Sequence, residues 1–245
     1  MTGPVRRRSR IQVYGPCHDE PQSKRDLGIA RPPKQPAWPD ALIAFALAVA
    51  GGLALIVAVR TRWIPPVLAN YLGHAWMAAI ALGWYFLLGQ RFPIGSIKRR
   101  MRPWYIVALV LIVVNVAETF ASPPSAGLHL PSRPTLIAEL VFLAFIVGPT
   151  EELLFRGLIQ TGLHQSMGPW GTVIGALLFG LFHLINVGFQ PLGATLQQVF
   201  TAIVIGLVFG VLYNRTRNLV GASLAHSVAD FSGTAIPLLA YLIAR

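Results

Sequence analysis

The stretch LIAELVFLAFIVGPTEELLFR, residues 136–156, places two adjacent glutamates and an arginine directly after a largely apolar run. Such a run is typical of a helix in lipid, whereas Glu151, Glu152 and Arg156 are costly there. Ionisable side chains inside an apolar segment usually mark a functional site, because lipid offers nothing that stabilises their charge. The stretch therefore predicts a membrane protein whose chemistry takes place among its membrane-spanning helices.

The composition of the whole chain supports this interpretation. Of 245 residues, 54% are hydrophobic and only 12% are charged, and the mean hydropathy is +0.59. A helix needs about 20 residues to cross the hydrocarbon core. We therefore predict an all-α, polytopic transmembrane bundle of seven or eight helices around a polar cavity. Its expected spans are Ala41–Val59, Pro66–Leu88, Trp104–Ala121, Thr135–Val147, Gly171–Val187, Val199–Tyr213 and two shorter ones, Leu219–Ala229 and Ala235–Ala244.

The first forty residues differ from the rest of the chain. Residues 1–40 are rich in proline and basic side chains, which predicts a disordered cytoplasmic tail ahead of a transmembrane domain at 41–245. The single cysteine, Cys17, lies in this tail, so no internal disulfide is possible.

The basic residues alternate from loop to loop. Eight of the 20 lysines and arginines precede residue 40, and five more lie between residues 91 and 102. The first and third loops carry only Arg60, Arg62 and Arg133. Because cytoplasmic loops collect Lys and Arg, this pattern predicts a cytoplasmic N-terminus in a protein of the cell (plasma) membrane. The net charge of +11 then reflects topology and contacts with anionic lipids, and we expect no nucleic-acid partner.

The first polar motif spans Gly148 to Arg156. Pro149 predicts a kinked or restarted helix, which Thr150 would cap. Glu152 and Arg156 have the i, i+4 spacing of a helical ion pair. Adjacent glutamates point about 100° apart, so Glu151 could face a cavity while arginine holds its neighbour. Alternatively, the segment is an interfacial helix end with a solvated ion pair.

A second motif places His183 on the helical face of Phe179 and Asn186, in a run without another ionisable group. Imidazole can act as acid, base or metal ligand near neutral pH. A histidine that merely bonds a neighbouring helix would look the same in sequence. Straight helices put Glu151 and His183 at depths that differ by about 12 Å, so a kink, a tilt or a later helix start must bring them level.

The third motif aligns His226 with Asp230, again at i and i+4. Two polar groups on one face of an apolar helix must point into the bundle, either for packing or for function. Together, the three motifs offer a carboxylate that can take a proton from water and imidazoles that can stabilise an oxyanion. This combination is what hydrolysis of an amide by water requires.

The ordered motifs Glu151-Glu152-x-x-x-Arg156, Phe179-x-x-x-His183 and His226-x-x-x-Asp230 resemble those of the CAAX-protease and bacteriocin-processing family of intramembrane endopeptidases. The resemblance covers about residues 100–243. It implies that Glu151 activates water together with His183, that Glu152 and Arg156 support it, and that His226 and residue 230 form the oxyanion site. Peptides or membrane proteins within the lipid bilayer are the implied substrates.

Asp230 departs from the family, which often has asparagine at this position. An ionised carboxylate would repel an oxyanion, so Asp230 is either protonated, as burial favours, or orients His226. We favour the second role.

Two questions of mechanism and class stay open at this level. The implied chemistry is either metal-free or zinc-dependent, with Glu151, His183 and His226 as the three ligands. The chain could also be a non-catalytic family member, such as an immunity or scaffold protein, or an ion-coupled transporter. Glu151 and His183, whose loss would indicate a non-catalytic member, are both present. The two halves of the chain show no matching interrupted helices of the transporter kind. Both observations favour the peptidase.

Overall fold

A computed structural model describes residues 34–97, 100–121 and 132–243, and these are all helix or connection, without a strand. The described residues form an all-α bundle of seven continuous helices, which confirms the predicted fold class. Most of the tail assigned to residues 1–40 lies outside the described residues, and the first helix begins at Trp38. Asp40, in its first turn, accepts a hydrogen bond from the Ala37 backbone N–H and so helps to start this helix.

The helices follow one another through short connections. Three of the seven contain π- or 3₁₀-helical turns, which carry the label η. In chain order the elements are α1 (Trp38–Arg60), α2 (Pro66–Leu82) with η2 (Gly83–Leu87), α3 (Arg102–Ala121), the long helix made of α4 (Arg133–Phe142), η3 (Leu143–Val147), α5 (Gly148–Glu152), η4 (Leu153–Gln160) and α6 (Thr161–Met167), then α7 (Pro169–Phe182) with η5 (His183–Gly188), α8 (Leu192–Thr216) and α9 (Leu219–Ile243).

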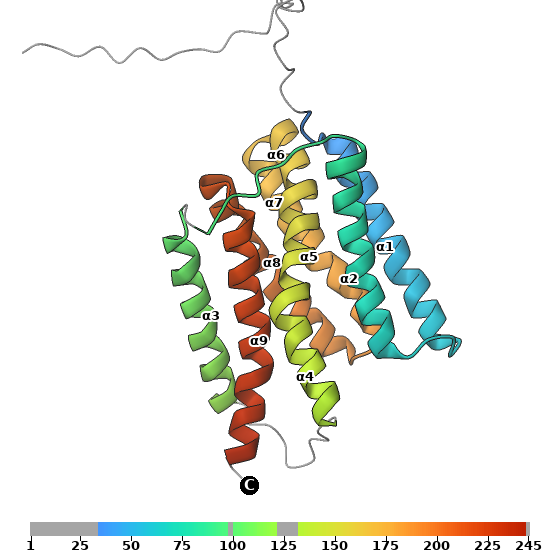
Figure 1. The fold of residues 1–245 in the computed structure, drawn as a ribbon, viewed down its shortest axis with the longest axis vertical. Helices are drawn as coiled ribbons and strands as arrows, with labels where there is room; N and C mark the ends of the chain where they lie inside the picture. Colours follow the sequence, from blue (N-terminus) through green and yellow to red (C-terminus); the bar gives the residue numbers. More distant parts are fainter. Residues whose placement is uncertain (1–33, 98–99, 122–131, 244–245) are drawn as a thin grey trace, which may run out of the picture. The chain divides into compact units, whose positions relative to one another are not determined.

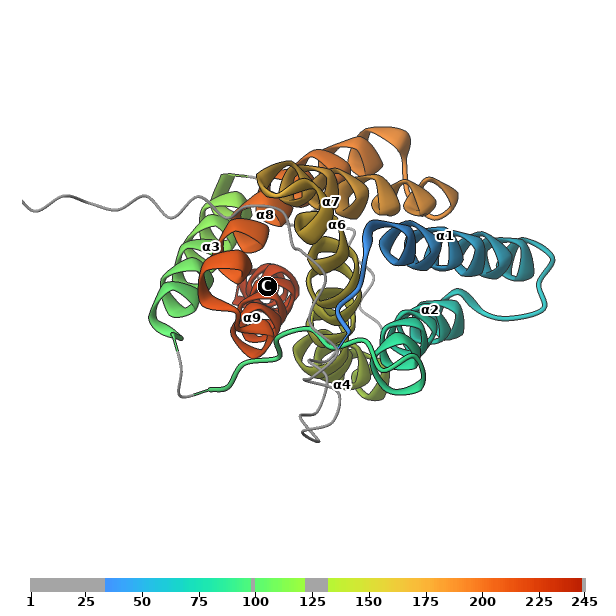
Figure 2. The same ribbon diagram turned by 90° about the horizontal axis from the view of Figure 1, so that it is seen from above.

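The long α4–α6 helix forms the centre of the bundle (Figure 2). The α1–α2 hairpin packs on one side of it and the α3–α9 pair lies on the other, while α7 and α8 pack together along a third side. This central position brings the helix that carries the two glutamates into contact with α1, α2, α7 and α9.

Large apolar side chains are exposed on the outside of the bundle. Four helices of the described residues are long and apolar enough to cross a membrane: Trp38–Arg60, Arg102–Ala121, Pro169–Gly188 and Leu192–Thr216. Large apolar side chains such as Leu109, Phe145 and Phe200 are more than half exposed, whereas several polar side chains are buried. This pattern of apolar exterior and polar interior is that of an integral membrane protein.

The two short spans expected at the C-terminus are one helix, so the count is seven and not eight. Helix α9 runs from Leu219 to Ile243 and contains Pro237 in its interior. The prediction divided this segment because Asp230, Ser232 and Gly233 interrupt its apolar run. Packing against α3 and α5 supports the helix through that interruption.

The expected restart at Pro149 is also wrong in detail. The helix continues through Pro149, and the π-helical stretch η3 directly before it accommodates the missing hydrogen bond and the bulk of the ring. Thr150 does not cap a new helix, because its hydroxyl donates to the carbonyls of Ile146 and Val147 at 2.8 and 3.0 Å. The helix therefore passes Pro149 by a π-helical adjustment and not by a restart.

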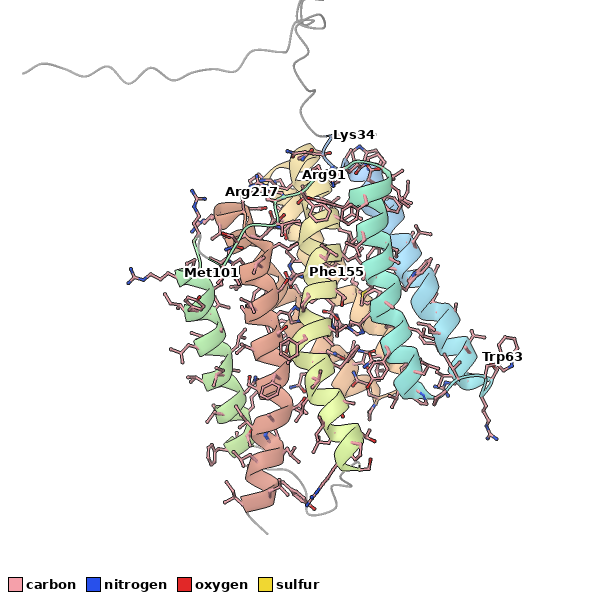
Figure 3. All side chains as sticks on the ribbon, in the orientation of Figure 1. Lys34, Trp63, Arg91, Met101, Phe155 and Arg217 are labelled. Carbon is pink, nitrogen blue, oxygen red and sulfur yellow. The ribbon has the colours of Figure 1, made fainter. Side chains whose placement is uncertain are left out.

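The two ends of the bundle differ in charge. Figure 3 shows Lys34, Arg91 and Arg217 at one end, which we call the basic end, and Trp63 at the opposite end. The α2–α3 connection crosses the basic end, where the carbonyl of Ile94 accepts the backbone N–H of Leu219 at 2.8 Å. Gly95 follows with φ +79, and a Cβ there would lie 2.3 Å from the Asn218 side chain. The connection thus packs tightly onto the start of α9.

Candidate active site

A cavity of about 550 Å³ lies between the α1–α2 hairpin, the central α4–α6 helix, the end of α7 with η5, and the helices α8 and α9. Four of the residues singled out in the sequence line it: Glu151, His183, His226 and Asp230. The three motifs therefore meet at one place. The cavity is the polar intramembrane space that the fold prediction included.

Glu152 and Arg156 are buried and are not among the residues that line the cavity. The guanidinium nitrogen Nη1 of Arg156 is 3.2 Å from Oε1 of Glu152, and the two side chains are only 2% and 0% exposed. The guanidinium also stacks on the Phe179 ring, 4.3 Å from its centroid. The pair is fully buried, which is not the solvated helix end considered as the alternative.

A glycine lets α5 approach α9 closely enough for their side chains to meet. A Cβ on Gly148 would lie 2.7 Å from both the backbone nitrogen and the hydroxyl of Ser227. Small residues permit such close helix packing in membranes. Glu152 follows Gly148 by one turn and His226 is next to Ser227, so this approach places Glu152 beside His226.

His226 joins the two glutamates and Asp230. Its Nδ1 donates to Oε1 of Glu152 at 2.8 Å. Its Nε2 lies 3.6 Å from Oε2 of Glu151 and 3.6 Å from Oδ2 of Asp230. The short hydrogen bond that fixes the ring is thus the one that Glu152 accepts, while Asp230, expected to orient His226, makes a longer contact with the other ring nitrogen.

His183 sits where α7 tightens into the 3₁₀ turn η5. Its Nδ1 lies 2.9 Å from the carbonyl oxygen of Phe179, so the proton of this hydrogen bond is on Nδ1. Although straight helices would put Glu151 and His183 at different depths, both line the same cavity. The helix α7 begins at Pro169, and the central helix departs from regular α geometry on both sides of Glu151.

His74, which sequence reasoning missed, completes the surroundings of Glu151. It comes from α2, and its Nε2 lies 3.5 Å from Oε1 of Glu151. Its Nδ1 is held by the carbonyl of Asn70 at 3.0 Å. The available signal was that His74 is the only His, Asp, Glu, Lys or Arg in the apolar run Pro66–Leu88, which by itself marks a candidate site.

The three histidines share one arrangement. Each comes from a different helix and has Nδ1 engaged, in His74 and His183 by a carbonyl four residues earlier and in His226 by Glu152. In each ring Nε2 is therefore the nitrogen left for the cavity. Fixing one ring nitrogen through the other is how proteins set the tautomer of a working histidine.

The residues proposed as zinc ligands, Glu151, His183 and His226, line one cavity but are not clustered as a ligand set. Within the described residues, no three His, Cys, Asp or Glu side chains are grouped closely enough to hold a metal ion. Around Glu151 the nearest ring nitrogens contact the carboxylate itself, at 3.5 and 3.6 Å. The donor set is thus arranged as carboxylate–imidazole contacts and does not fit a metal centre.

Comparison with known proteins bears on this site. Residues 133–232 match the family of type II CAAX prenyl endopeptidase Rce1-like proteins, which confirms the resemblance that the motifs indicated. The chain is also 28% identical over 163 residues to the uncharacterized protein YpbD of Bacillus subtilis (strain 168), covering 62% of this chain and 79% of that protein. No solved structure matches. The matched region contains all six residues singled out from the motifs, whereas His74 lies outside it.

Proposed function

We propose that this chain is an intramembrane endopeptidase of the Rce1-like kind, in which Glu151 activates the water that attacks a peptide bond. The family similarity supports a protease. The observation that carries the mechanism is the position of Glu151, a carboxylate at the cavity wall with an imidazole facing each of its oxygens.

The attacking water lies between Glu151 and His183 in this proposal. Because Nδ1 of His183 donates to a carbonyl, Nε2 of a neutral ring can accept a hydrogen bond. A water between two acceptors donates one hydrogen bond to each, and its lone pair then points toward the substrate. As the water attacks, Glu151 takes its proton and later passes it to the leaving amine.

His226 stabilises the oxyanion that forms during attack. In its doubly protonated form, the ring donates from Nδ1 to Glu152 and presents Nε2–H to the cavity. A donor fixed before the reaction stabilises developing charge without reorganising, which is the main source of catalytic power in such sites. Arg156, by pairing with Glu152, holds this donor system in place.

Asp230 acts through His226 rather than on the substrate. Its Oδ2 lies 3.6 Å from Nε2 of His226, on the cavity side of the ring. A carboxylate there favours the cationic imidazole that the oxyanion needs, and substrate binding displaces this long contact. Asp230 and Glu152 thus address opposite nitrogens of one ring.

The reaction in this proposal contains no metal step. The contacts between Glu151 and the histidines support a carboxylate base that works without zinc. Purified enzyme should keep its activity after incubation with a strong chelator, and adding zinc afterwards should not raise it. Activity lost to the chelator and restored by zinc would contradict this version.

The substrate is a peptide or membrane protein whose scissile bond reaches the cavity between the helices. Prenylated C-terminal peptides, leader peptides, bacteriocins and membrane-bound regulators share this requirement. A non-catalytic scaffold would not need two imidazoles on one carboxylate and a third oriented histidine in the same cavity, and this arrangement favours the peptidase over that alternative and over a transporter.

A direct test uses detergent-purified protein and a peptide library, with cleavage followed by mass spectrometry. New peptide termini should form with wild-type protein and not with Glu151→Gln, an exchange that keeps size but removes the base. The absence of any cleavage, or equal cleavage by both proteins, would reject the peptidase.

A further inference from the structure

We infer that the substrate polypeptide enters the cavity from the end of the bundle that carries Trp63, and therefore from the extracytoplasmic side of the membrane. That a substrate enters the cavity rests on the proposed function, whereas the direction of entry rests on geometry and charge. It separates this chain from a protease that works on cytoplasmic C-termini.

The cavity lining extends toward the Trp63 end. Along α2 the lining runs from Met77 to Pro66, the first residue of that helix. Eleven residues of helix correspond to about 16 Å. On the opposite wall the lining reaches Asn186 and Phe189, beside the connection that leads into α8. The cavity thus extends from Glu151 to the connections at this end of the bundle.

The basic end is closed over Glu151 by packed side chains. Leu154, Phe155 and Leu158, which follow Glu151 toward that end, are at most 1% exposed. Beyond them the α2–α3 connection packs against the central helix, where a Cβ on Gly157 would lie 2.7 Å from the Phe92 ring. None of the residues of this connection that the structure describes lines the cavity. A substrate arriving from the basic end would have to displace this packing.

Charge assigns the two ends to the two sides of the membrane. Lys34, Arg91, Arg100, Arg102, Arg215 and Arg217 lie in or beside the chain segments at the basic end. The Trp63 end carries Arg60, Arg62 and Arg133 among the described residues. Because cytoplasmic loops collect Lys and Arg, the basic end faces the cytoplasm and the open end faces away from it.

The entrance carries groups suited to a polypeptide backbone. Oε1 of Gln198 accepts hydrogen bonds from Asn186 at 2.9 Å and from Gln190 at 2.7 Å. This leaves the Nε2 donor of Gln198 and the Oδ1 acceptor of Asn186, both on side chains that line the cavity. A donor and an acceptor side by side match the C=O and N–H of an extended peptide. Apolar wall residues, such as Ile56 and Val67, can receive its side chains.

Cysteine accessibility tests the direction without requiring catalysis. In a Cys17→Ser background, Gly73→Cys places a thiol in the cavity wall, where the added Cβ makes only an ordinary 3.6 Å contact with Leu55. Trp63→Cys and Arg102→Cys mark the two ends. A charged, membrane-impermeant methanethiosulfonate is applied to intact cells and then to permeabilised cells, and all three thiols are counted after denaturation.

We expect Gly73→Cys and Trp63→Cys to react in intact cells and Arg102→Cys only after permeabilisation. The direction is wrong if Gly73→Cys reacts only together with Arg102→Cys, or if it reacts in neither condition while both end markers behave as expected. Reaction of Arg102→Cys in intact cells overturns the orientation. The same labelling should appear in a Glu151→Gln background, so a failure of the proposed chemistry would not be mistaken for a failure of the direction.

Once a cleaved peptide is identified, Gln198→Leu tests the entrance. This variant should raise KM several-fold and leave kcat nearly unchanged, because Gln198 contacts substrate away from the scissile bond. An unchanged KM removes Gln198 from the substrate path.

Discussion

Nε2 of His74 lies 3.5 Å from Oε1 of Glu151, and this contact joins α2 to the central helix across the cavity. On the other side of the same carboxylate, Nε2 of His226 lies 3.6 Å from Oε2. Glu151 is therefore held between two helices that are far apart in the sequence. His74 lies outside the region that matches the protease family, and the α1–α2 hairpin contributes this part of the site.

His74 is predicted to position Glu151. Replacing it by alanine removes the contact to Oε1 and lets the carboxylate turn toward His226. The contact is an ion-pair approach at 3.5 Å, and a loss of about 1.4 kcal/mol of positioning free energy corresponds to roughly tenfold in rate. We expect His74→Ala to lower kcat by that factor with little change in KM.

Two further variants distinguish positioning from general damage. His74→Gln retains an N–H donor at similar reach, so it should recover part of the lost kcat. His164→Gln, at a partly buried histidine that contacts Thr172 and does not line the cavity, should leave kcat unchanged. Equal rates for wild type and His74→Ala would remove His74 from the mechanism.

The Glu152–Arg156 pair is predicted to act through structure and through His226. Removing one partner of a buried ion pair costs about 3–5 kcal/mol, because the other charge is left uncompensated. Glu152→Gln and Arg156→Met should therefore melt at lower temperature in detergent and lose activity. Arg102→Met, at an exposed arginine at the start of α3, serves as the control and should melt like wild type. Unchanged melting of both buried-pair variants would mean that the pair does not stabilise the fold.

Asp230 is predicted to tolerate asparagine better than an apolar side chain. In Asp230→Asn the amide oxygen can still face the N–H of His226, whereas Asp230→Leu removes every acceptor at this position. We expect the first variant to retain substantial activity and the second to lose most of it, measured as rates across a range of pH beside wild type. Complete inactivity of folded Asp230→Asn would assign Asp230 a direct part in proton transfer instead.

The sequence predicted the fold class and the meeting of the three motifs because both follow from local patterns. Apolar runs of fixed length require helices, and an ionisable side chain inside such a run must face other protein. For this reason Glu151, His183, His226 and Asp230 were expected in one cavity and are found there. The i, i+4 pair of Glu152 and Arg156 was predictable for the same reason, as helical spacing fixes it.

What the sequence did not predict depends on packing between helices. The hydrogen bond from His226 to Glu152 follows from how closely α5 approaches α9 at Gly148, and no spacing rule contains that distance. The continuity of the helix through Pro149 depends on a π-helical adjustment, which the residue types alone do not reveal. His74 was missed because no motif surrounds it and its partner lies in another helix.

The base function of Glu151 is the central claim, and one comparison tests it most directly. Hydrolysis by Glu151→Gln is measured beside Glu118→Gln, the same exchange at an exposed glutamate of α3, after thermal melting has confirmed that both proteins are folded. Loss of a positioned general base costs about 10²–10⁴-fold in rate. The hydrolysis rate of Glu151→Gln should therefore fall by about that factor, while Glu118→Gln keeps the wild-type rate. A folded Glu151→Gln protein with the wild-type rate would contradict the account.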